Sequence, residues 1–228
     1  MARLPRLFAP GCAQHVLQRC ASGRTLALDE EDFATLVDCL AESTKVEGVA
    51  LHAYVLMPDH LHLLATPASE QALPRLMQSL GRRYVRHLNQ RHRLAGGLWA
   101  GRYRASVLDD DPYVLVCSRY VESNPVRNAL VEEPAHYRWS SFRHHAGLES
   151  QAFLTDHRCY WALGNTPFER QARYRGLFEL AIAPAELEAL RAATWHGWAL
   201  GGATFLRGLA KSANRRPLAL ARGRPRNI

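Results

Sequence analysis

The chain has 228 residues, of which 47% are hydrophobic, so it can bury one full core and a small second unit and is neither disordered nor fibrous. Its formal net charge of +8 favours a polyanionic partner, although a basic protein can carry such a charge without binding one. Five scattered cysteines without C-x-x-C spacing argue against a disulfide framework and a zinc ribbon, and no apolar run is long enough to cross a bilayer. We therefore expect a cytoplasmic protein without a secretion signal.

The first part of the chain predicts three strands and one helix. Residues 11–19 alternate loosely between apolar and polar and predict the first strand. Asp29–Ala41 predicts a helix, because acidic residues fill its first turn and apolar residues recur at helical spacing: Phe33, Leu36, Val37 and Leu40. Val49–Met57 and His60–Ala65 then predict the two strands of a hairpin, which the turn-forming pair Pro58-Asp59 connects.

A long basic helix is predicted next, over Ala72–Arg91. Residues 71–106 contain no carboxylate and eight arginines: Arg75, Arg82, Arg83, Arg86, Arg91, Arg93, Arg102 and Arg104. This one-signed stretch favours nucleic acid, because the planar guanidinium binds phosphate oxygens in pairs and stacks on bases. We expect the helix to face DNA through Arg82 and Arg83, with a plain amphipathic surface helix as the open alternative.

The sequence next predicts a fourth strand, which completes the sheet, and then a further helix. Leu98–Leu108 alternates over most of its length and predicts a strand. Asp111 suits an N-cap, Pro112 suits the first helical position and Pro125 ends the segment, which places Tyr120 near the end of a helix. The order strand, helix, hairpin, helix, strand, helix predicts an α+β fold with a central antiparallel sheet and helices mainly on one face.

The patterns weaken beyond residue 131, after a first domain of residues 1–130. Residues 166–182 and 184–193 predict short helices, so we expect a helical accessory region over 131–206. Residues 207–228 predict a flexible basic tail, since no carboxylate follows Glu188. Its end, Arg222-Gly223-Arg224-Pro225-Arg226, resembles the core of an AT-hook, which would place Arg222 and Arg224 in a DNA minor groove; a generic basic terminus is the open alternative.

Two histidines in the second strand of the hairpin form a candidate metal site. Side chains alternate along a strand, so His60 and His62 point to one face while Leu61 and Leu63 point to the other. Since the chain has eleven histidines, two ordinary half-buried residues are the alternative. A zinc hydrolase is disfavoured, because no H-x-x-x-D motif or second histidine pair lies nearby to complete the site.

These motifs together resemble a known family. His60-Leu61-His62 has the histidine, apolar, histidine order of the HUH endonucleases, and the segment Arg119–Arg127 is similar to the tyrosine segment of their single-tyrosine branch. Within that branch the chain resembles the REP-associated tyrosine transposases. The resemblance runs from His15-Val16 through Gly101-Arg102-Tyr103 to Tyr137-Arg138-Trp139-Ser140-Ser141. It implies a ferredoxin-like HUH fold with a helical C-terminal extension.

The resemblance implies a metal-dependent endonuclease and strand transferase, in which Tyr120 attacks single-stranded DNA in palindromic-repeat hairpins. The attack would leave a 5′-phosphotyrosyl link and a free 3′-hydroxyl. A free tyrosine has a pKa of about 10 and needs help at neutral pH, which Mg²⁺ or Mn²⁺ at His60 and His62 would supply. Asn124 lies one helical turn after Tyr120 and would add an oxygen ligand. The alternative is a catalytically silent protein of the same fold that binds or regulates DNA hairpins, with Tyr120 an ordinary half-buried residue.

The partner that the resemblance implies is single-stranded or hairpin DNA, while monomer and dimer both stay open. We expect DNA contacts from residues on several elements: Arg19, Arg102, Tyr103, Arg119 and Arg127. The arginines would bind phosphates and the tyrosine would stack on a base. Two residues depart from the family pattern, in which Asp59 is often an amide and Cys20 a glycine, and these leave the role of Asp59 and the end of the first strand open.

Overall fold

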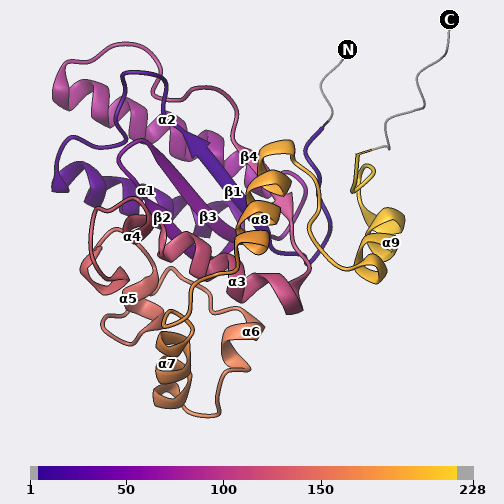
Figure 1. Ribbon diagram of the computed structural model, residues 1–228. Coiled ribbons are helices and arrows are strands. Elements are labelled where there is room, and N and C mark those ends of the chain that lie inside the picture. The colour runs from indigo at the N-terminus through magenta and orange to yellow at the C-terminus, as the bar shows by residue number, and fades with distance from the viewer. Residues whose placement is uncertain (1–4, 220–228) are drawn as a thin grey trace, which may run out of the picture.

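A four-stranded antiparallel sheet lies at the centre of the protein, in a computed structural model that describes residues 5–219 (Figure 1). The strands lie in the order β2-β3-β1-β4, with bounds Gln14–Arg19 (β1), Val49–Leu56 (β2), His60–Pro67 (β3) and Arg104–Val107 (β4). β3 lies between β1 and β2, and β1 lies between β3 and β4, so each strand–helix–strand unit is split by an antiparallel strand. This is the ferredoxin-like arrangement, and the predicted α+β class is confirmed.

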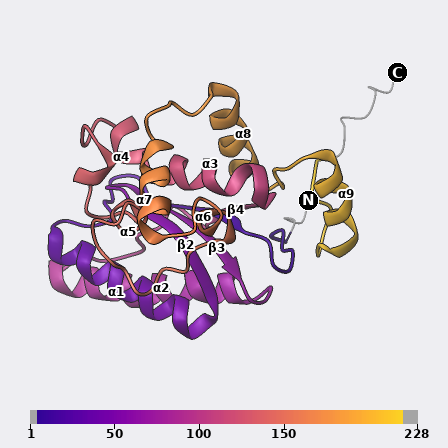
Figure 2. The same ribbon diagram turned by 90° about the horizontal axis from the view of Figure 1, so that it is seen from below.

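Two long helices cover one face of the sheet (Figure 2). They are α1 (Glu30–Glu47) and α2 (Ala72–His92). Leu61 and Leu63 point from β3 into the core that these helices close. The last turns of α1 bury Ser43 and Thr44, which the apolar pattern does not mark, so the helix is longer than the sequence predicts. It ends at Gly48, whose φ of 64° is a left-handed conformation that glycine adopts without strain.

The opposite face, which carries the histidine pair, lies under α3 (Asp110–Glu122) and α8 (Pro184–His196) (Figures 1 and 2). Val114 and Cys117 of α3 join Val55 of β2 and Leu64 of β3 in a second core. Nearly every side chain of β2 and β3 is buried, so the sheet needs a cover on each side. The helices are therefore divided between the two faces, whereas the sequence predicts them mainly on one.

Shorter helices follow: α4 (Asn124–Arg127), η1 (Pro134–His136), α5 (Phe142–His145), α6 (Arg158–Trp161), α7 (Pro167–Gly176) and α9 (Ala203–Ser212). The helix α9 crosses residue 207, where the sequence predicts a flexible tail to begin. Its Leu209 packs with Leu7 in a small third core, which gives this segment an apolar partner from the other end of the chain. Within residues 5–219, no helix is long and apolar enough to cross a membrane.

Two element boundaries differ from the sequence prediction. The strand β4 begins only at Arg104, because Gly101, with a φ of 149°, interrupts the extended segment before it. The helix α3 begins at Asp110 with Asp109 at the N-cap position, two residues before the predicted cap Asp111. Neither difference moves Tyr120 from the last turn of α3.

A buried carboxylate joins α3 to the accessory helices. Glu122 is fully buried and accepts hydrogen bonds from Ser141, from His145 Nδ1 (2.7 Å) and from Tyr174 Oη (2.7 Å). These donors lie next to α5, within α5 and within α7. Each buried donor needs an acceptor, so this one side chain fixes the accessory region to the helix that carries Tyr120.

We expect Glu122→Ala to lower the free energy of unfolding by about 3–5 kcal/mol, because it leaves buried donors without their charged acceptor. Urea denaturation monitored by circular dichroism measures this change. The exposed Glu132 provides a matched control, and Glu132→Ala should change stability by less than about 0.5 kcal/mol. A loss below about 1 kcal/mol for Glu122→Ala would contradict the anchoring role.

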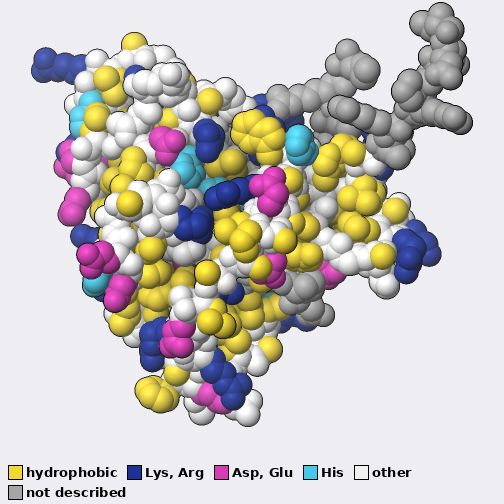
Figure 3. Space-filling model, viewed as in Figure 1, with side chains coloured by type: hydrophobic (Ala, Val, Ile, Leu, Met, Phe, Trp, Pro, Cys, Tyr) yellow, Lys and Arg dark blue, Asp and Glu magenta, His cyan; other side chains and the backbone are white. Residues whose placement is uncertain are grey.

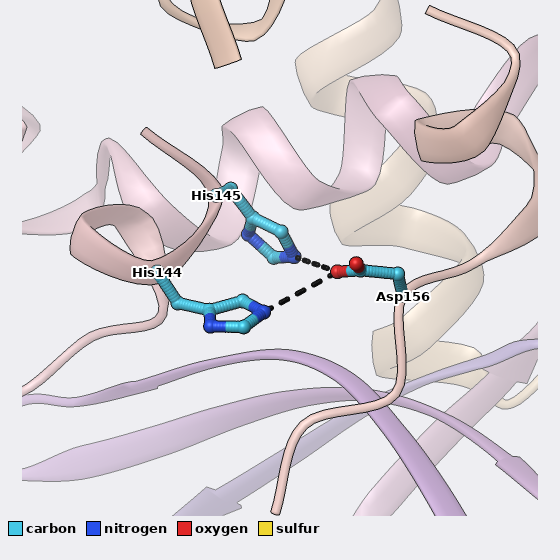
Figure 4. A group of neighbouring side chains, drawn as sticks. All are labelled: His144, His145 and Asp156. Carbon is cyan, nitrogen blue, oxygen red and sulfur yellow. Dashed lines mark hydrogen bonds and ion pairs between the residues drawn. The ribbon is translucent and has the colours of Figure 1, made fainter. Parts of the chain in front are cut away.

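A group of metal-type ligands lies beside this carboxylate (Figure 4). His144 and His145 both point at Asp156, with Nε2–Oδ1 distances of 3.3 and 3.8 Å. His144 Nδ1 accepts a hydrogen bond from the backbone N–H of Gln151 (3.1 Å), so the proton of the neutral ring lies on Nε2 and is donated to Asp156. Nε2 of His144 therefore has no lone pair to offer a metal. His144, His145 and Asp156 form a hydrogen-bonded cluster rather than a metal site.

Candidate active site

The alternation of β3 places His60 and His62 on the floor of a cavity of about 470 Å³. The walls come from β1, from α3 and α4, and from α8. Tyr120 and Asn124 line the same cavity, so the structure brings together the four residues that the sequence predicts as nucleophile and metal ligands. Figure 3 shows this face of the molecule, where histidine and arginine side chains gather beside α8.

The ring of His60 is held between two polar partners. Its Nδ1 lies 2.6 Å from Asp59 Oδ1, and its Nε2 lies 3.1 Å from Asn124 Nδ2. Burial lowers the pKa of His60, while Asp59 opposes this shift. A neutral ring that donates Nδ1–H to the carboxylate keeps the lone pair of Nε2 directed into the cavity. Asp59, whose role the sequence leaves open, therefore orients the candidate ligand.

The ring of His62 is oriented by a residue from the neighbouring strand. His62 Nδ1 lies 2.8 Å from Nε2 of His15 on β1, and His15 Nδ1 lies 2.7 Å from Thr194 Oγ1 on α8. Burial lowers the pKa of His15 to about 3 and that of His62 well below its usual value, so both rings are neutral. His62 Nδ1–H donates to His15 Nε2, and His15 Nδ1–H donates to Thr194 Oγ1. The lone pair of His62 Nε2 therefore stays available.

Burial of a neutral His15 gives a testable pH dependence of stability. In the unfolded chain His15 binds a proton near pH 6.5, whereas the folded protein binds it only near pH 3. Its contribution to stability is therefore full above pH 6.5 and falls as the pH drops from 6.5 toward 3. At pH 5 the expected loss from this residue is about 2 kcal/mol.

The variant His15→Gln isolates this effect, because glutamine keeps hydrogen-bonding groups but does not titrate. Urea denaturation at about pH 7.5 and about pH 5 should show a smaller pH-dependent loss for the variant than for the unmodified protein. Equal losses in the two proteins would contradict the burial of a neutral His15.

Tyr120 stands over two of the histidine rings that line the cavity, those of His15 and His62. Its ring meets those of His15 and His62 edge to face, with centroids 5.5 Å apart in each case. The guanidinium of Arg127 lies 4.3 Å from the centre of the Tyr120 ring and is held by a hydrogen bond to Ser123 Oγ (2.6 Å). The structure therefore places a fixed positive charge beside the ring that carries the candidate nucleophile.

Asn124 reaches the cavity from a second helix. The sequence predicts one continuous helix that carries both Tyr120 and Asn124, but α3 ends at Glu122 and Asn124 begins α4. The correction is small, because Ser123 N–H still bonds to the carbonyl of Arg119 and keeps the helical path. Asn128 Nδ2 donates to Asn124 Oδ1 (2.6 Å), which fixes the amide that faces His60.

The predicted DNA-contacting residues fall into different places. Arg19 and Arg127 line the cavity itself, and Arg102 lines two adjoining cavities of about 300 and 220 Å³. Tyr103 is only 6% exposed, and Arg6 lies 3.5 Å from the centre of its ring. Base stacking on Tyr103 would require Arg6 to move, so the structure does not favour that role.

Arg119 precedes Tyr120 but does not share its cavity. Successive helix residues point about 100° apart, and the Arg119 side chain reaches the other side of α3. There it donates a hydrogen bond to the carbonyl of Leu180, and burial lowers its pKa. Arg119 thus contacts the accessory region rather than the candidate site. Arg222 and Arg224 lie outside the described residues.

The basic helix α2 lies on the face of the sheet opposite to the cavity (Figure 2). Two of its arginines meet carboxylates of α1 and of its N-cap: Arg83 pairs with Glu42, and Arg91 Nη1 lies 2.8 Å from Asp29 and 2.7 Å from Asp32. The acids come from an earlier segment, so the charge pattern of residues 71–106 could not reveal them. The structure separates Arg82 and Arg83 from the candidate site and neutralises part of the stripe.

Sequence reasoning assigned no role to two sets of cavity residues. His15 gave one local signal, since it lies in a predicted strand and could face the same way as the histidine pair. Thr194 and Arg191 gave none, because they come from α8, far along the chain. Only the packing of α8 over β1 and β4 brings them to the site.

A ferredoxin-like sheet with paired histidines beneath a helix tyrosine has the architecture of a tyrosine transposase. The family model described as transposase IS200 like matches residues 10–124, and the chain belongs to that family. The family resemblance seen in the sequence is thereby confirmed. The matched residues include His15, His60, His62, Tyr120 and Asn124, whereas α8 lies beyond them.

Two solved structures are similar to the chain, and the first of them supports the same fold. A REP-associated tyrosine transposase, solved bound to a REP hairpin, is similar with a TM-score of 0.53 and 13% sequence identity, over 70% of this chain and 93% of its own. A Deinococcus radiodurans protein described as a candidate transposase is 23% identical with a TM-score of 0.37, over 54% of this chain and 97% of its own. No curated protein matches the chain.

Proposed function

We propose that this transposase is a metal-dependent single-stranded DNA endonuclease and strand transferase that acts on palindromic-repeat hairpins through a 5′-phosphotyrosine intermediate. The observation that carries the proposal is the convergence of Tyr120, His60, His62 and Asn124 on one cavity. The similar transposase solved with a REP hairpin supports DNA hairpins as the partner.

The cavity residues fit a divalent metal such as Mg²⁺ or Mn²⁺. His60 and His62 offer two imidazole nitrogens whose other nitrogens are already engaged by Asp59 and His15. Asn124 would offer its amide oxygen after a half-turn of the amide, since its nitrogen now faces His60. When bound, the metal would polarise and orient the scissile phosphate.

Tyr120 would carry the covalent step. Its phenolic oxygen forms a bond to the phosphorus, the bond from phosphorus to the 3′ oxygen breaks, and the phenol proton passes in the net reaction to the released 3′-hydroxyl. Arg127, beside the ring, stabilises the negative charge that develops on the phenol. The phosphotyrosyl ester keeps the energy of the original diester, so attack by a 3′-hydroxyl rejoins the strands without ATP.

Covalent capture of DNA tests the proposal. The full chain is incubated with Mn²⁺ and a labelled DNA hairpin that has a single-stranded flank, and denaturing electrophoresis detects a labelled protein. We expect an adduct that mass spectrometry locates on Tyr120. Binding of the hairpin without any adduct would instead identify a catalytically silent DNA-binding protein of this fold.

A further inference from the structure

Three cavities on one face of the protein meet at a single side chain. Trp195 lines the active-site cavity of about 470 Å³ and both adjoining cavities, of about 300 and 220 Å³. Arg19 is shared by the first two, and Arg102 and Arg104 are shared by the last two. The three cavities therefore adjoin one another along one surface, which we call the flank groove, and which runs from the candidate active site past α8 to the edge of β4.

Trp195 is presented in a defined orientation at the centre of the flank groove. It lies in the last turn of α8, which Gly197 ends in a left-handed conformation. The guanidinium of Arg104 lies 3.6 Å from the ring centre and also donates to the carbonyl of Trp195, so the indole is held from β4. Arg104 covers part of the ring, but 47% of the residue is exposed, whereas Tyr103 under Arg6 is only 6% exposed, so Trp195 still offers aromatic surface to a ligand.

The charge of the flank groove is one-sided. Among the described residues that line the three cavities, Glu188 is the one carboxylate, while arginines line every part. An arginine-lined groove with an exposed indole has the two properties that single-stranded nucleic acids require, which are cations along the backbone and a flat apolar surface for a base.

We infer that the flank groove binds the single strand of DNA next to the cleavage site, with Trp195 stacked on one nucleobase. This inference rests on the proposed function and adds to it the path of the substrate. Arg102 and Arg104 contact the phosphates of that strand, and the double-stranded stem of a hairpin lies elsewhere. Trp195 lies on α8, beyond the residues 10–124 that the family model matches. The C-terminal extension thereby takes part in substrate selection.

Binding measurements on two DNA molecules test the inference. Fluorescence anisotropy compares a hairpin with a single-stranded flank and the same hairpin without it, using the non-cleaving Tyr120→Phe form of the full chain. We expect Trp195→Ala to weaken binding of the flanked hairpin by about 5- to 150-fold, the range for loss of one base–aromatic stack, and to leave the blunt hairpin within about twofold. Trp195→Phe keeps an aromatic face and should stay within about threefold of the parent on both DNAs.

The chain offers a matched control in Trp161, which is 52% exposed and also carries a stacked arginine, Arg170, at 4.1 Å. Because Trp161 lines none of the three cavities, Trp161→Ala should leave both affinities unchanged. A second measurement varies the DNA: an abasic nucleotide is placed in turn at each flank position, and binding to the parent protein and to Trp195→Ala is compared. One position should weaken binding to the parent protein while leaving binding to Trp195→Ala unaffected.

Equal weakening of both DNAs by Trp195→Ala, or no weakening of either, would overturn the inference. So would an abasic series in which no position depends on Trp195. Adduct formation without any Trp195 effect leaves the proposed cleavage intact and removes only the groove. A Trp195 effect without adduct supports the groove and contradicts the proposed cleavage.

Discussion

Replacing Tyr120 with phenylalanine should remove all covalent DNA adduct and lower cleavage by at least about 1000-fold, while the affinity for a flanked hairpin stays within about threefold. The substitution deletes only the hydroxyl, so the ring keeps its edge-to-face contacts with His15 and His62 and its place beside Arg127. Denaturing electrophoresis of labelled DNA measures the adduct, and anisotropy measures the affinity.

Tyr113 supplies the control, because it lies on the same helix α3 but does not line the active-site cavity. Tyr113→Phe should cleave and form adduct at close to the unmodified rate. Adduct that persists in Tyr120→Phe, or that mass spectrometry places on another tyrosine, would show that Tyr120 is not the nucleophile.

Removing either histidine of the strand pair should lower metal-dependent cleavage by at least about 100-fold. His60→Ala and His62→Ala each delete one of the proposed nitrogen ligands, whereas Arg19 and Arg127, which we expect to contact DNA, stay in place, so hairpin binding should persist. Cleavage rates across a Mn²⁺ titration, together with calorimetric titration of Mn²⁺ into the protein alone, measure the effect. Asn124→Ala should act more weakly, chiefly by raising the Mn²⁺ concentration needed for half-maximal rate.

The exposed His136 on η1 provides the comparison for the histidine variants. His136→Ala should bind Mn²⁺ and cleave like the unmodified chain. If His60→Ala or His62→Ala cleaves at the unmodified rate with the same response to Mn²⁺, the ligand assignment is wrong.

The convergence of His60 and His62 follows from the sequence alone, because the side-chain period of a strand is two and the intervening Leu61 needs a core on the other face. The place of Tyr120 and Asn124 on a following helical segment was equally local, although the break at Ser123 was not. Short-range spacing of this kind determines direction, and together with the family resemblance it predicted the four residues that meet in the cavity.

Contacts between residues on different helices and strands could not be predicted in the same way. The charge pattern of α2 favours nucleic acid, but only the packing of α1 beside α2 shows that Arg83 pairs with Glu42 and Arg91 with Asp29. His15 orients His62 only because β1 lies next to β3, a pairing between strands that are distant in the sequence. Local periodicity carries no information about such neighbours, since they depend on how the elements pack.

The sequence by itself determined the fold class, the family and the histidine, tyrosine and asparagine set, because each depends on spacing within one element or on a family motif. The tertiary structure alone decided which arginines stay available and what covers the site. The packing of α8 over β1 and β4 brings Thr194 to His15 and Trp195 to the mouth of the cavity. The physical reason is that burial and charge pairing are properties of the packed surfaces of several elements, whereas the direction of a side chain is a property of one.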